Sequence, residues 1–565
     1  MSEPILSAGA ALLARLKTVG VDYIFANSGT DFPPIIEGLA EAAAKGIALP
    51  KALTIPHEHA AMGMAHGYYL ASGRAQAVLA HTNVGLANCA IGALNAHVEH
   101  VPILLFSGRT PTVEKGRFGA RTVPIGGGQE MRDQAALVRE ASKWDYELRF
   151  PEQAADLVDR AHAIASSSPR GPVYVSLPRE VLCQPCPATV LDTPPNMRAH
   201  GLYAAPEHIA ALAARIAKAK APVIFAQHGA GDAAGFATLA RIAQNWAIPV
   251  CQYWAGQLAL ATDHPMCTNW EPGPLLTEAD LILCLDVLAP WMPEAHEPQG
   301  DAFVVQLGPN PLSSRTPIRH FRADLSIAAD TGPALEALES ALAAYAPGED
   351  VAARFARIAE RNKSARDDAL AAAAPDTAPG MTKAQIARAL SEGVEGQDAT
   401  ILSELGCPMA PMRLTHPQAW YQEPHAGGLG WSLPAAMGMQ LANPDRLIVA
   451  TMGDGTYMFA NPVVCHQIAE ALGLSILILV LNNGEWGAVR HSVLGLYPDG
   501  HAAKANQVPL TGLQPSPDFA LVARASRALA FRAETHADFA QMLPEALAHI
   551  RARKGTALID IRTRP

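Results

Sequence analysis

Short apolar runs alternate with amphipathic stretches of helical length through most of the chain. This alternation is typical of the strands and crossover helices of a parallel sheet that is covered on both faces. The runs are too short for period alone to assign, but the glycine, proline and asparagine residues beside them favour strands. The predicted strands cover residues 21–25, 51–55, 77–81, 102–108, 222–227, 281–286, 303–308, 400–404, 447–452, 475–483 and 556–561. The pattern therefore predicts an α/β fold of doubly wound parallel sheets.

Two passages with the composition of linkers divide this pattern. Residues 183–206 are rich in proline, which favours extended chain over helix, and residues 371–380 combine alanine, proline and glycine. A chain of 565 residues has room for about three domains. We therefore expect three doubly wound domains, over residues 1–185, 205–345 and 380–565.

Composition narrows the class of protein. The net charge of −10 offers no basic surplus for a phosphate backbone, so we expect no nucleic-acid partner. Hydrophobic residues make up 49% and charged residues 17%, which favours a globular oligomer. The apolar runs are far shorter than the roughly 20 residues of a spanning helix, and the first residues lack a basic leader. We therefore expect no membrane segment and a cytoplasmic location.

Polar residues follow two neighbouring predicted strands. Gly453, Asp454 and Gly455 come directly after one strand, and Asn482 and Asn483 end the next. Carboxyl ends of parallel strands meet at one edge of the sheet, where open α/β folds bind ligands. Carboxylate and amide oxygens suit Mg²⁺, and the glycines allow a diphosphate to approach the backbone. The alternative interpretation is a turn and a strand cap.

Residues 427–459 and 481–490 extend this constellation into a longer pattern, which resembles the cofactor motif of thiamine-diphosphate enzymes. Among the thiamine-diphosphate enzymes, this pattern is most similar to the benzoylformate decarboxylase and acetohydroxyacid synthase group. The resemblance implies thiamine diphosphate and Mg²⁺ as cofactors. It also implies that Leu429 supports the bent V shape of bound thiamine diphosphate. The implied cofactor-binding residues are Gly427, Leu429, Gly453, Gly455, Thr456 and Asn483. The implied metal ligands are Asp454, Asn483 and the backbone carbonyl of Glu485.

Two further candidates lie in the first predicted domain. Glu58 follows the strand at 51–55 and opens an Ala- and Met-rich stretch, so its carboxylate is a candidate for activating the cofactor. Alternatively, it is a helix N-terminal charge that faces water. His81 stands where benzoylformate decarboxylase-like enzymes carry an active-site histidine, and a histidine can move protons near neutral pH. Its alternative role is a hydrogen-bonded cap of the strand.

The expected substrate site departs from that group. Thr30 stands at the place of the family's substrate-binding serine, although it is equally plausible as a helix start. Ala488 is the second predicted substrate residue, and His491 and Ser492 beyond it lack the aromatic rings of an aryl pocket. The family's second histidine has no clear match, with His296 a few residues away. We therefore expect a substrate other than benzoylformate.

Three functions remain open at this point. The first is a thiamine-dependent decarboxylase that acts on a 2-oxo acid. The second is an acetolactate synthase-like carboligase or a 2-hydroxyacyl-CoA lyase, in which the Glu485 side chain supplies an extra acid or base; otherwise Glu485 is a solvated loop residue. The third is a nucleotide-binding regulatory protein, which rests on a GxGxxxG run at 229–235 that is not the dinucleotide fingerprint. The resemblance also implies a homodimer or homotetramer with the active site between subunits. In related proteins the middle domain holds FAD, ADP or neither.

Overall fold

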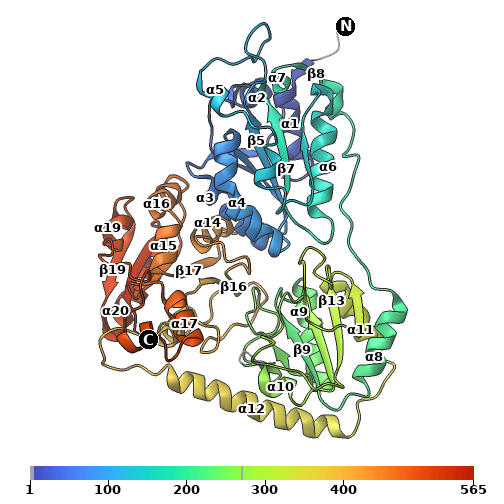
Figure 1. The fold of residues 1–565 in the computed structure, drawn as a ribbon, viewed down its shortest axis with the longest axis vertical. Helices are drawn as coiled ribbons and strands as arrows, with labels where there is room; N and C mark the ends of the chain where they lie inside the picture. The colour runs from blue at the N-terminus through green and yellow to red at the C-terminus, as the bar shows by residue number, and fades with distance from the viewer. Residues whose placement is uncertain (1–4, 269–270, 565) are drawn as a thin grey trace. The chain divides into compact units, whose positions relative to one another are not determined.

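The computed structural model describes residues 5–268 and 271–564. Three six-stranded sheets, each entirely parallel, carry helices on their faces (Figure 1), so the predicted α/β fold class is confirmed. The chain forms two compact units. The first contains Met1–Gly201 and Pro424–Asp445, and the second contains Leu202–Glu423 and Arg446–Pro565. We describe each unit separately.

The first unit is built on one sheet with the strand order β3-β2-β4-β5-β7-β6. Its strands are β2 (Tyr23–Ala26), β3 (Lys51–Thr54), β4 (Gln76–Ala80), β5 (Ile103–Arg109), β6 (Asp145–Glu147) and β7 (Val173–Pro178). Its helices are α1 (Ala8–Thr18), α2 (Pro33–Ala44), α3 (Glu58–Ser72), α4 (Thr82–Val98), α5 (Ile125–Gly128), α6 (Ala154–Ser166), α7 (Arg179–Leu182) and α14 (Ser432–Ala442). The four strands that the pattern predicts here all form, because their apolar runs lie between helix-covered faces.

A distant piece of chain completes the first unit. Helix α14 packs closely on α3, and glycines make this approach possible. A Cβ at Gly67 would lie 1.9 Å from the carbonyl oxygen of Ala435, and one at Gly438 would lie 1.9 Å from that of Met64. The predicted C-terminal domain at 380–565 therefore gives residues 424–445 to the first unit. Small residues on both helices decide this, because they let the two backbones meet.

The predicted proline-rich linker is partly ordered as strand. Strand β8 (Pro185–Pro187) pairs antiparallel with β1 (Ile5–Ser7), and Ile5 lies opposite Pro187. Cys186 lies within this strand and is buried, so it acts as a small apolar residue of the core.

The second unit holds the other two sheets. One has the order β11-β10-β9-β12-β13-β14, and the other has the order β16-β15-β17-β18-β20-β19. The strands of the former are β9 (Pro222–Ala226), β10 (Val250–Cys251), β11 (Cys267–Thr268), β12 (Leu281–Leu285), β13 (Phe303–Gly308) and β14 (Leu325–Ala328). Those of the latter are β15 (Ala399–Glu404), β16 (Trp420–Gln422), β17 (Leu447–Gly453), β18 (Leu477–Asn482), β19 (Leu529–Ala533) and β20 (Ala557–Arg562). All predicted strands in this unit form.

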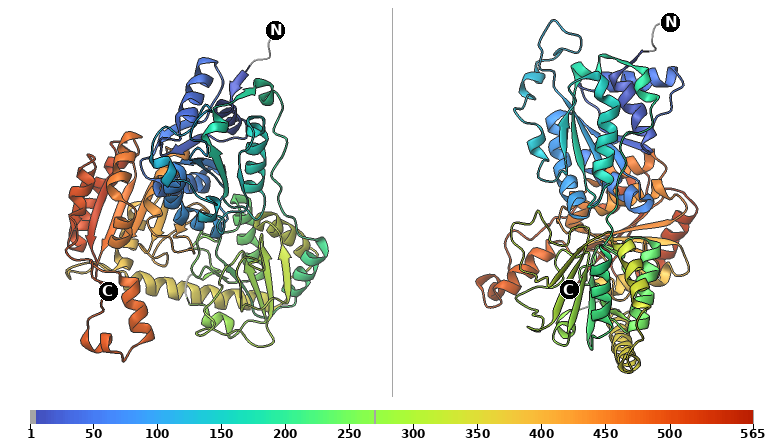
Figure 2. Two further views of the ribbon diagram at one scale, coloured as in Figure 1. Left: turned by 45° about the horizontal axis from the view of Figure 1, so that its top comes forward. Right: turned by 90° about the vertical axis from the view of Figure 1, so that its right-hand side faces the viewer.

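Helices flank both sheets of the second unit. They are α8 (Pro206–Ile216), α9 (Ala233–Trp246), α10 (Gly273–Leu276), α11 (Thr331–Leu342), α12 (Asp350–Ala372), α13 (Lys383–Gly393), α15 (Asp454–Phe459), α16 (Pro462–Ala471), α17 (Gly487–Leu496), α18 (His501–Ala505), α19 (Phe519–Arg524) and α20 (His536–Arg551). The long helix α12 leads from the first of these sheets to the second (Figures 1 and 2). Along the described chain, none of the helices combines the length and the apolar character that crossing a bilayer requires.

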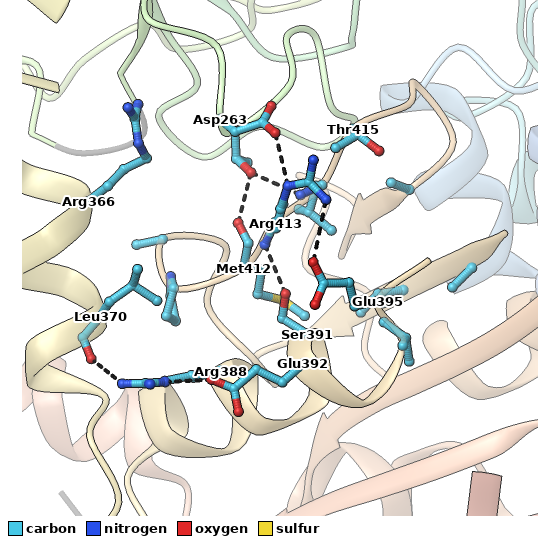
Figure 3. Close-up of a pocket in the computed structure, with 18 of the residues that line it drawn as sticks. Asp263, Arg366, Leu370, Arg388, Ser391, Glu392, Glu395, Met412, Arg413 and Thr415 are labelled. Atoms are coloured by element: carbon cyan, nitrogen blue, oxygen red, sulfur yellow. Dashed lines mark hydrogen bonds and ion pairs between the residues drawn. The ribbon is translucent and has the colours of Figure 1, made fainter. Parts of the chain in front are cut away.

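A cavity of about 350 Å³ lies in this unit between α12, α13 and the segment 410–416 (Figure 3). Two of the arginines that line it carry acidic partners. Arg413 is paired with Asp263 and Glu395, and Arg388 is paired with Glu392. These pairs compensate the charges of Arg388 and Arg413.

Candidate active site

Glu58 is a buried carboxylate at the start of α3. Its side chain is 5% exposed, and each of its oxygens accepts a hydrogen bond from an asparagine amide. Asn27 donates to Oε1 at 2.9 Å, and Asn88 donates to Oε2 at 3.0 Å. Both oxygens of this buried carboxylate thus have a hydrogen-bond donor, as buried polar groups require. The interpretation of Glu58 as a helix-end charge facing water is therefore wrong.

His81 lies at the carboxyl end of β4 and precedes α4. Its Nδ1 forms a short hydrogen bond with Oδ1 of Asp31, and its Nε2 lies 3.0 Å from Nε2 of Gln129. The hydrogen bond to Asp31 raises the pKa of His81, and the charges of Asp31 and Glu58 add to this rise, while burial opposes it. His81 makes no side-chain hydrogen bond that caps α4. Both ring nitrogens have polar neighbours, and the role of His81 in proton transfer stays a prediction.

Thr30 lies beside this histidine. The threonine is exposed, and its backbone carbonyl accepts a hydrogen bond of 3.0 Å from Nη1 of Arg179. Thr30, Asp31 and Gln129 line one small cavity. Thr30 is not a residue of α2, which begins at Pro33 and shows no side-chain cap. The predicted substrate residue therefore lies at the same sheet edge as His81.

The segment around Gly427 and Leu429 is held against α4. Asn95 clamps it with both atoms of its amide: Nδ2 donates to the Gly428 carbonyl at 2.8 Å, and Oδ1 accepts from the Gly428 N–H at 3.1 Å. Gly427 has a φ of 68°, in the left-handed region that favours glycine. The backbone of this segment is thus fixed by a side chain of the same unit.

Asp454 is the central acidic group at the sheet edge in the second unit. It begins α15 directly after β17, and its side chain is 2% exposed. Oδ2 accepts a hydrogen bond of 3.0 Å from the Gly484 N–H, which belongs to the turn after the paired strand β18. Burial raises the pKa of Asp454, whereas backbone N–H groups act against this rise. Within the described ranges, no ion pair joins Asp454 to a basic side chain, so its charge is only partly compensated.

The other predicted ligands gather in the turn after β18. Asn483 Oδ1 accepts a 3.1 Å hydrogen bond from the Glu485 N–H, and the Glu485 carbonyl accepts one of 2.9 Å from Gly487. The Glu485 carboxylate is 30% exposed and lies 3.8 Å from Nε of Arg490. The Asn482 side chain has a different partner, because its Nδ2 donates a hydrogen bond to Asp560. The structure thus brings Asp454 and the turn at 483–485 to one edge.

This donor set fits Mg²⁺. A buried carboxylate, a side-chain amide oxygen and a backbone carbonyl are hard oxygen ligands, and a divalent cation would compensate the buried charge of Asp454. Of the two glycines beside Asp454, Gly453 leaves the backbone accessible, whereas Gly455 is covered. A Cβ at Gly453 would meet open space, and one at Gly455 would lie 2.4 Å from the ring of Trp486, which therefore packs on this glycine. Thr456 is buried in the first turn of α15, and Ala488 is an exposed residue of α17.

Five residues of the first unit extend the predicted site: Asp31, Gln129, Asn27, Asn88 and Asn95. Asn27 and Asp31 follow β2 at the carboxyl edge of the sheet, so the rule that places polar groups at that edge could have found them. Asn88 and Asn95 lie on α4, where their role depends on which face of the helix meets Glu58 and residue 428. Gln129 comes from a long connection, and no pattern in the sequence points to it.

Comparison with known proteins identifies the family. The N-terminal TPP binding domain of thiamine pyrophosphate enzymes matches residues 6–137, the central domain matches residues 209–338, and the C-terminal TPP binding domain matches residues 405–561. The chain therefore belongs to the thiamine pyrophosphate-dependent enzymes, and the predicted superfamily is confirmed.

Relatives extend over nearly the whole chain. A protein named probable 2-ketoarginine decarboxylase from Pseudomonas aeruginosa is 28% identical over 93% of this chain and 89% of its own. Benzoylformate decarboxylase from the same organism is 27% identical over 97% of each chain. The solved structure of a thiamine diphosphate-dependent 4-hydroxybenzoylformate decarboxylase from Rhodococcus jostii matches with a TM-score of 0.80 and 23% identity over 99% of each chain, which supports the fold. The predictions of an enzyme and of thiamine-dependent decarboxylation as its reaction class are confirmed.

Proposed function

We propose that this chain catalyses the thiamine-diphosphate- and Mg²⁺-dependent decarboxylation of a 2-oxo acid to an aldehyde and CO₂. The observation that carries this proposal is the polar edge of the first sheet. There a buried carboxylate, Glu58, is held by two amides, and a histidine, His81, is paired with a carboxylate. These are groups that hold and move protons, and the relatives named as decarboxylases support the same reaction.

Two groups of residues supply different contacts to the cofactor. Asp454, Asn483 and the carbonyl of Glu485 hold Mg²⁺, and Gly453, Gly455 and Thr456 meet the diphosphate. Gly427 and Leu429 meet the aminopyrimidine, supported by the clamp from Asn95. Bound thiamine diphosphate supplies the carbon nucleophile and the electron sink for loss of CO₂. The shielded carboxylate of Glu58 exchanges the proton that activates it.

The overall reaction consumes one proton. A 2-oxo acid anion loses CO₂, and the carbonyl carbon that carried the carboxylate gains a hydrogen, so a proton donor is required. His81 delivers this proton from Nε2, the ring nitrogen that faces away from Asp31. Thr30, at the same sheet edge, binds the substrate carboxylate through its hydroxyl. Both residues thus act on the end of the substrate at which the bond breaks.

The remainder of the substrate is polar or aliphatic rather than aromatic. Ala488, His491 and Ser492 of α17 present no phenyl, phenol or indole ring. One relative carries a name that refers to 2-ketoarginine, a 2-oxo acid with a long polar side chain. We therefore include 2-ketoarginine among the test substrates, with pyruvate, branched aliphatic 2-oxo acids and benzoylformate.

The test is incubation of the purified protein with thiamine diphosphate, Mg²⁺ and each 2-oxo acid, followed by proton NMR of the products. We expect an aldehyde from at least one aliphatic or polar acid, and no aldehyde from the His81→Ala variant. Formation of acyloins alone would favour a carboligase. Cleavage of 2-hydroxyacyl thioesters without reaction of any 2-oxo acid would contradict the proposal and would favour a lyase, in which the Glu485 carboxylate has a role.

Three expectations from the sequence stay predictions. They are the cytoplasmic location, the homodimer or homotetramer with its active site between subunits, and the presence or absence of a nucleotide in the middle domain. Sedimentation analysis tests the assembly. The absorption spectrum of the purified protein tests for bound flavin.

A further inference from the structure

We propose that Asp31 is the positioning residue of His81: it accepts the hydrogen bond from Nδ1–H and so leaves Nε2 as the ring nitrogen that exchanges protons. This inference rests on the proposed function, because it assigns a task to a histidine that the decarboxylation uses. It adds to that function the residue Asp31, the reacting atom Nε2 of His81 and the tautomer that carries its proton on Nδ1.

The surroundings of Asp31 make His81 its main partner. The aspartate is 4% exposed, so its charge is almost entirely removed from water. One oxygen bonds to Nδ1 of His81, and the other accepts a hydrogen bond of 3.3 Å from the Thr82 N–H. Among the described residues, His81 is the one side chain that forms an ion pair with Asp31. A buried carboxylate with this single side-chain partner orients the ring strongly.

The backbone is shaped to admit this pair. A Cβ at Gly29 would lie 2.1 Å from Nδ1 of His81, and a Cβ at Gly108 would lie 1.5 Å from Oδ2 of Asp31. Neither glycine has a φ in the left-handed region, so space rather than conformation requires them. Thr82, by contrast, is not glycine and has a φ of 39°, a conformation that costs free energy and turns its N–H toward Asp31.

The opposite side of the ring is also arranged for proton exchange. The Gln129 amide lies 3.0 Å from Nε2 of His81. An amide can donate to the neutral nitrogen through its NH₂ group or, after rotation, accept from the protonated nitrogen through its oxygen. Gln129 can therefore solvate both protonation states of Nε2. Asp31 has no such freedom, because an ionised carboxylate only accepts.

The charged groups around His81 favour its protonated form. Asp31, after β2, and Glu58, on α3, both carry negative charge toward the ring, and both raise its pKa. The nearby arginines are occupied elsewhere. Arg179 donates to the carbonyls of Gly119 and Thr30, and Arg121 is paired with Glu130. The balance of charge at the ring is therefore negative.

The direct test measures His81 without substrate or cofactor. The Cε1–H of each histidine exchanges with D₂O at a rate that follows protonation of the ring, and mass spectrometry of peptides reads the exchange at each histidine as a function of pH. We expect the exchange midpoint of His81 to lie above 6.5, the ordinary value for histidine. In Asp31→Asn it falls by about one pH unit or more, because the opposing charge is lost.

Asp22→Asn is the matched control. Asp22 lies at the other end of the same strand, and it also has partners, Tyr68 and Arg74. This variant loses thermal stability but keeps the His81 midpoint. An unchanged midpoint in Asp31→Asn, in a protein that retains its fold by circular dichroism, would overturn the proposal.

Activity then connects the pair to the reaction. With the substrate found in the product screen, we expect Asp31→Asn to lower kcat about 10- to 100-fold. We also expect the high-pH limb of the kcat profile to move to lower pH, because Nε2 loses its proton at lower pH. A shifted exchange midpoint with an unchanged kcat profile would support the pairing of Asp31 with His81 but would contradict the role of His81 in the proposed function. The two failures are therefore distinguishable.

A glycine pair provides an independent check on the geometry. Gly108→Ala places a methyl group where Oδ2 of Asp31 lies, whereas Gly128→Ala places one in open space. We expect Gly108→Ala to lower the exchange midpoint of His81 as Asp31→Asn does, and Gly128→Ala to leave it unchanged. Equal midpoints in the two variants would contradict the placement of Asp31.

Discussion

Two buried carboxylates, one in each unit, lie at the carboxyl edges of their sheets and are treated in opposite ways. Glu58 receives one side-chain amide donor on each oxygen, whereas Asp454 receives backbone N–H groups. Burial raises the pKa of Asp454. The raised pKa of Asp454 supports the cation site proposed there.

The cavity shown in Figure 3 adds a contrast to these two sites. It is larger than the cavity beside His81, yet two of its arginines, Arg388 and Arg413, already form ion pairs with neighbouring acids. At the sheet edges, by contrast, His81 keeps Nε2 available for proton exchange, and Asp454 keeps a negative charge available for a cation. The hydrogen bonds and charges of the polar groups therefore indicate the chemistry better than the volume of a cavity does.

The largest effect is expected from Asp454→Ala. This variant removes the only side-chain carboxylate among the implied ligands, so Mg²⁺ and thiamine diphosphate should no longer remain bound. We expect at least a 100-fold loss of activity, because loss of a group that merely supports a metal ligand already costs about 10- to 100-fold. Gel filtration followed by assay of bound thiamine diphosphate checks the result. Retention equal to that of the unchanged protein would contradict the metal role.

Glu58→Gln should separate binding from turnover. We expect the variant to retain thiamine diphosphate and Mg²⁺ while its kcat falls about 100- to 10,000-fold, because a glutamine cannot exchange the activating proton. Isothermal titration of the cofactor and a steady-state assay with the substrate measure the two quantities. Full activity would refute the catalytic assignment.

Asn88→Ala tests whether the amides matter to Glu58. It removes the donor to Oε2 and leaves the donor from Asn27 in place. A hydrogen bond to a charged group contributes roughly 1.5–3 kcal/mol, so we expect kcat to fall about 10-fold or more. Asn196→Ala, which removes a surface amide that donates to Asp156, serves as the control. A loss in the control as large as that in Asn88→Ala would indicate a general effect on folding.

The smallest effect, on stability without cofactor, contrasts the two carboxylates directly. The pKa of Asp454 in the folded protein is raised above its ordinary value of 3.8. Asp454 therefore contributes to the free energy of unfolding below pH 3.8, and this contribution is lost as the pH rises through the folded-state pKa. At neutral pH we therefore expect Asp454→Asn to raise Tm by about 2 °C, and this gain should disappear in acid. Glu58→Gln should lower Tm instead, because its new NH₂ group faces an amide donor. Scanning fluorimetry from pH 4 to 8 measures both, and shifts of the same sign would remove the contrast.

Part of this site could be predicted because parallel sheets obey a simple rule. Apolar runs define the strands, and polar residues directly after them must gather at the carboxyl edge. Asp454, the turn at 483–485, Glu58 and His81 follow this rule, and the structure places them at such edges. The same rule applies to Asp31, two residues before the helix that begins at Pro33, although its neighbour Thr30 was the predicted residue.

The sequence by itself determined the three parallel sheets, the thiamine-dependent class and the main candidate residues, because strand periodicity and short motifs are local properties of the chain. Only the tertiary structure decided which partners each candidate has. Asn88 and Asn95 depend on the packing of α4, Gln129 arrives from a distant connection, and Gly67 and Gly438 join α14 to the first unit. Such contacts join residues far apart in the chain, and their distances depend on how whole helices pack, which no local pattern records.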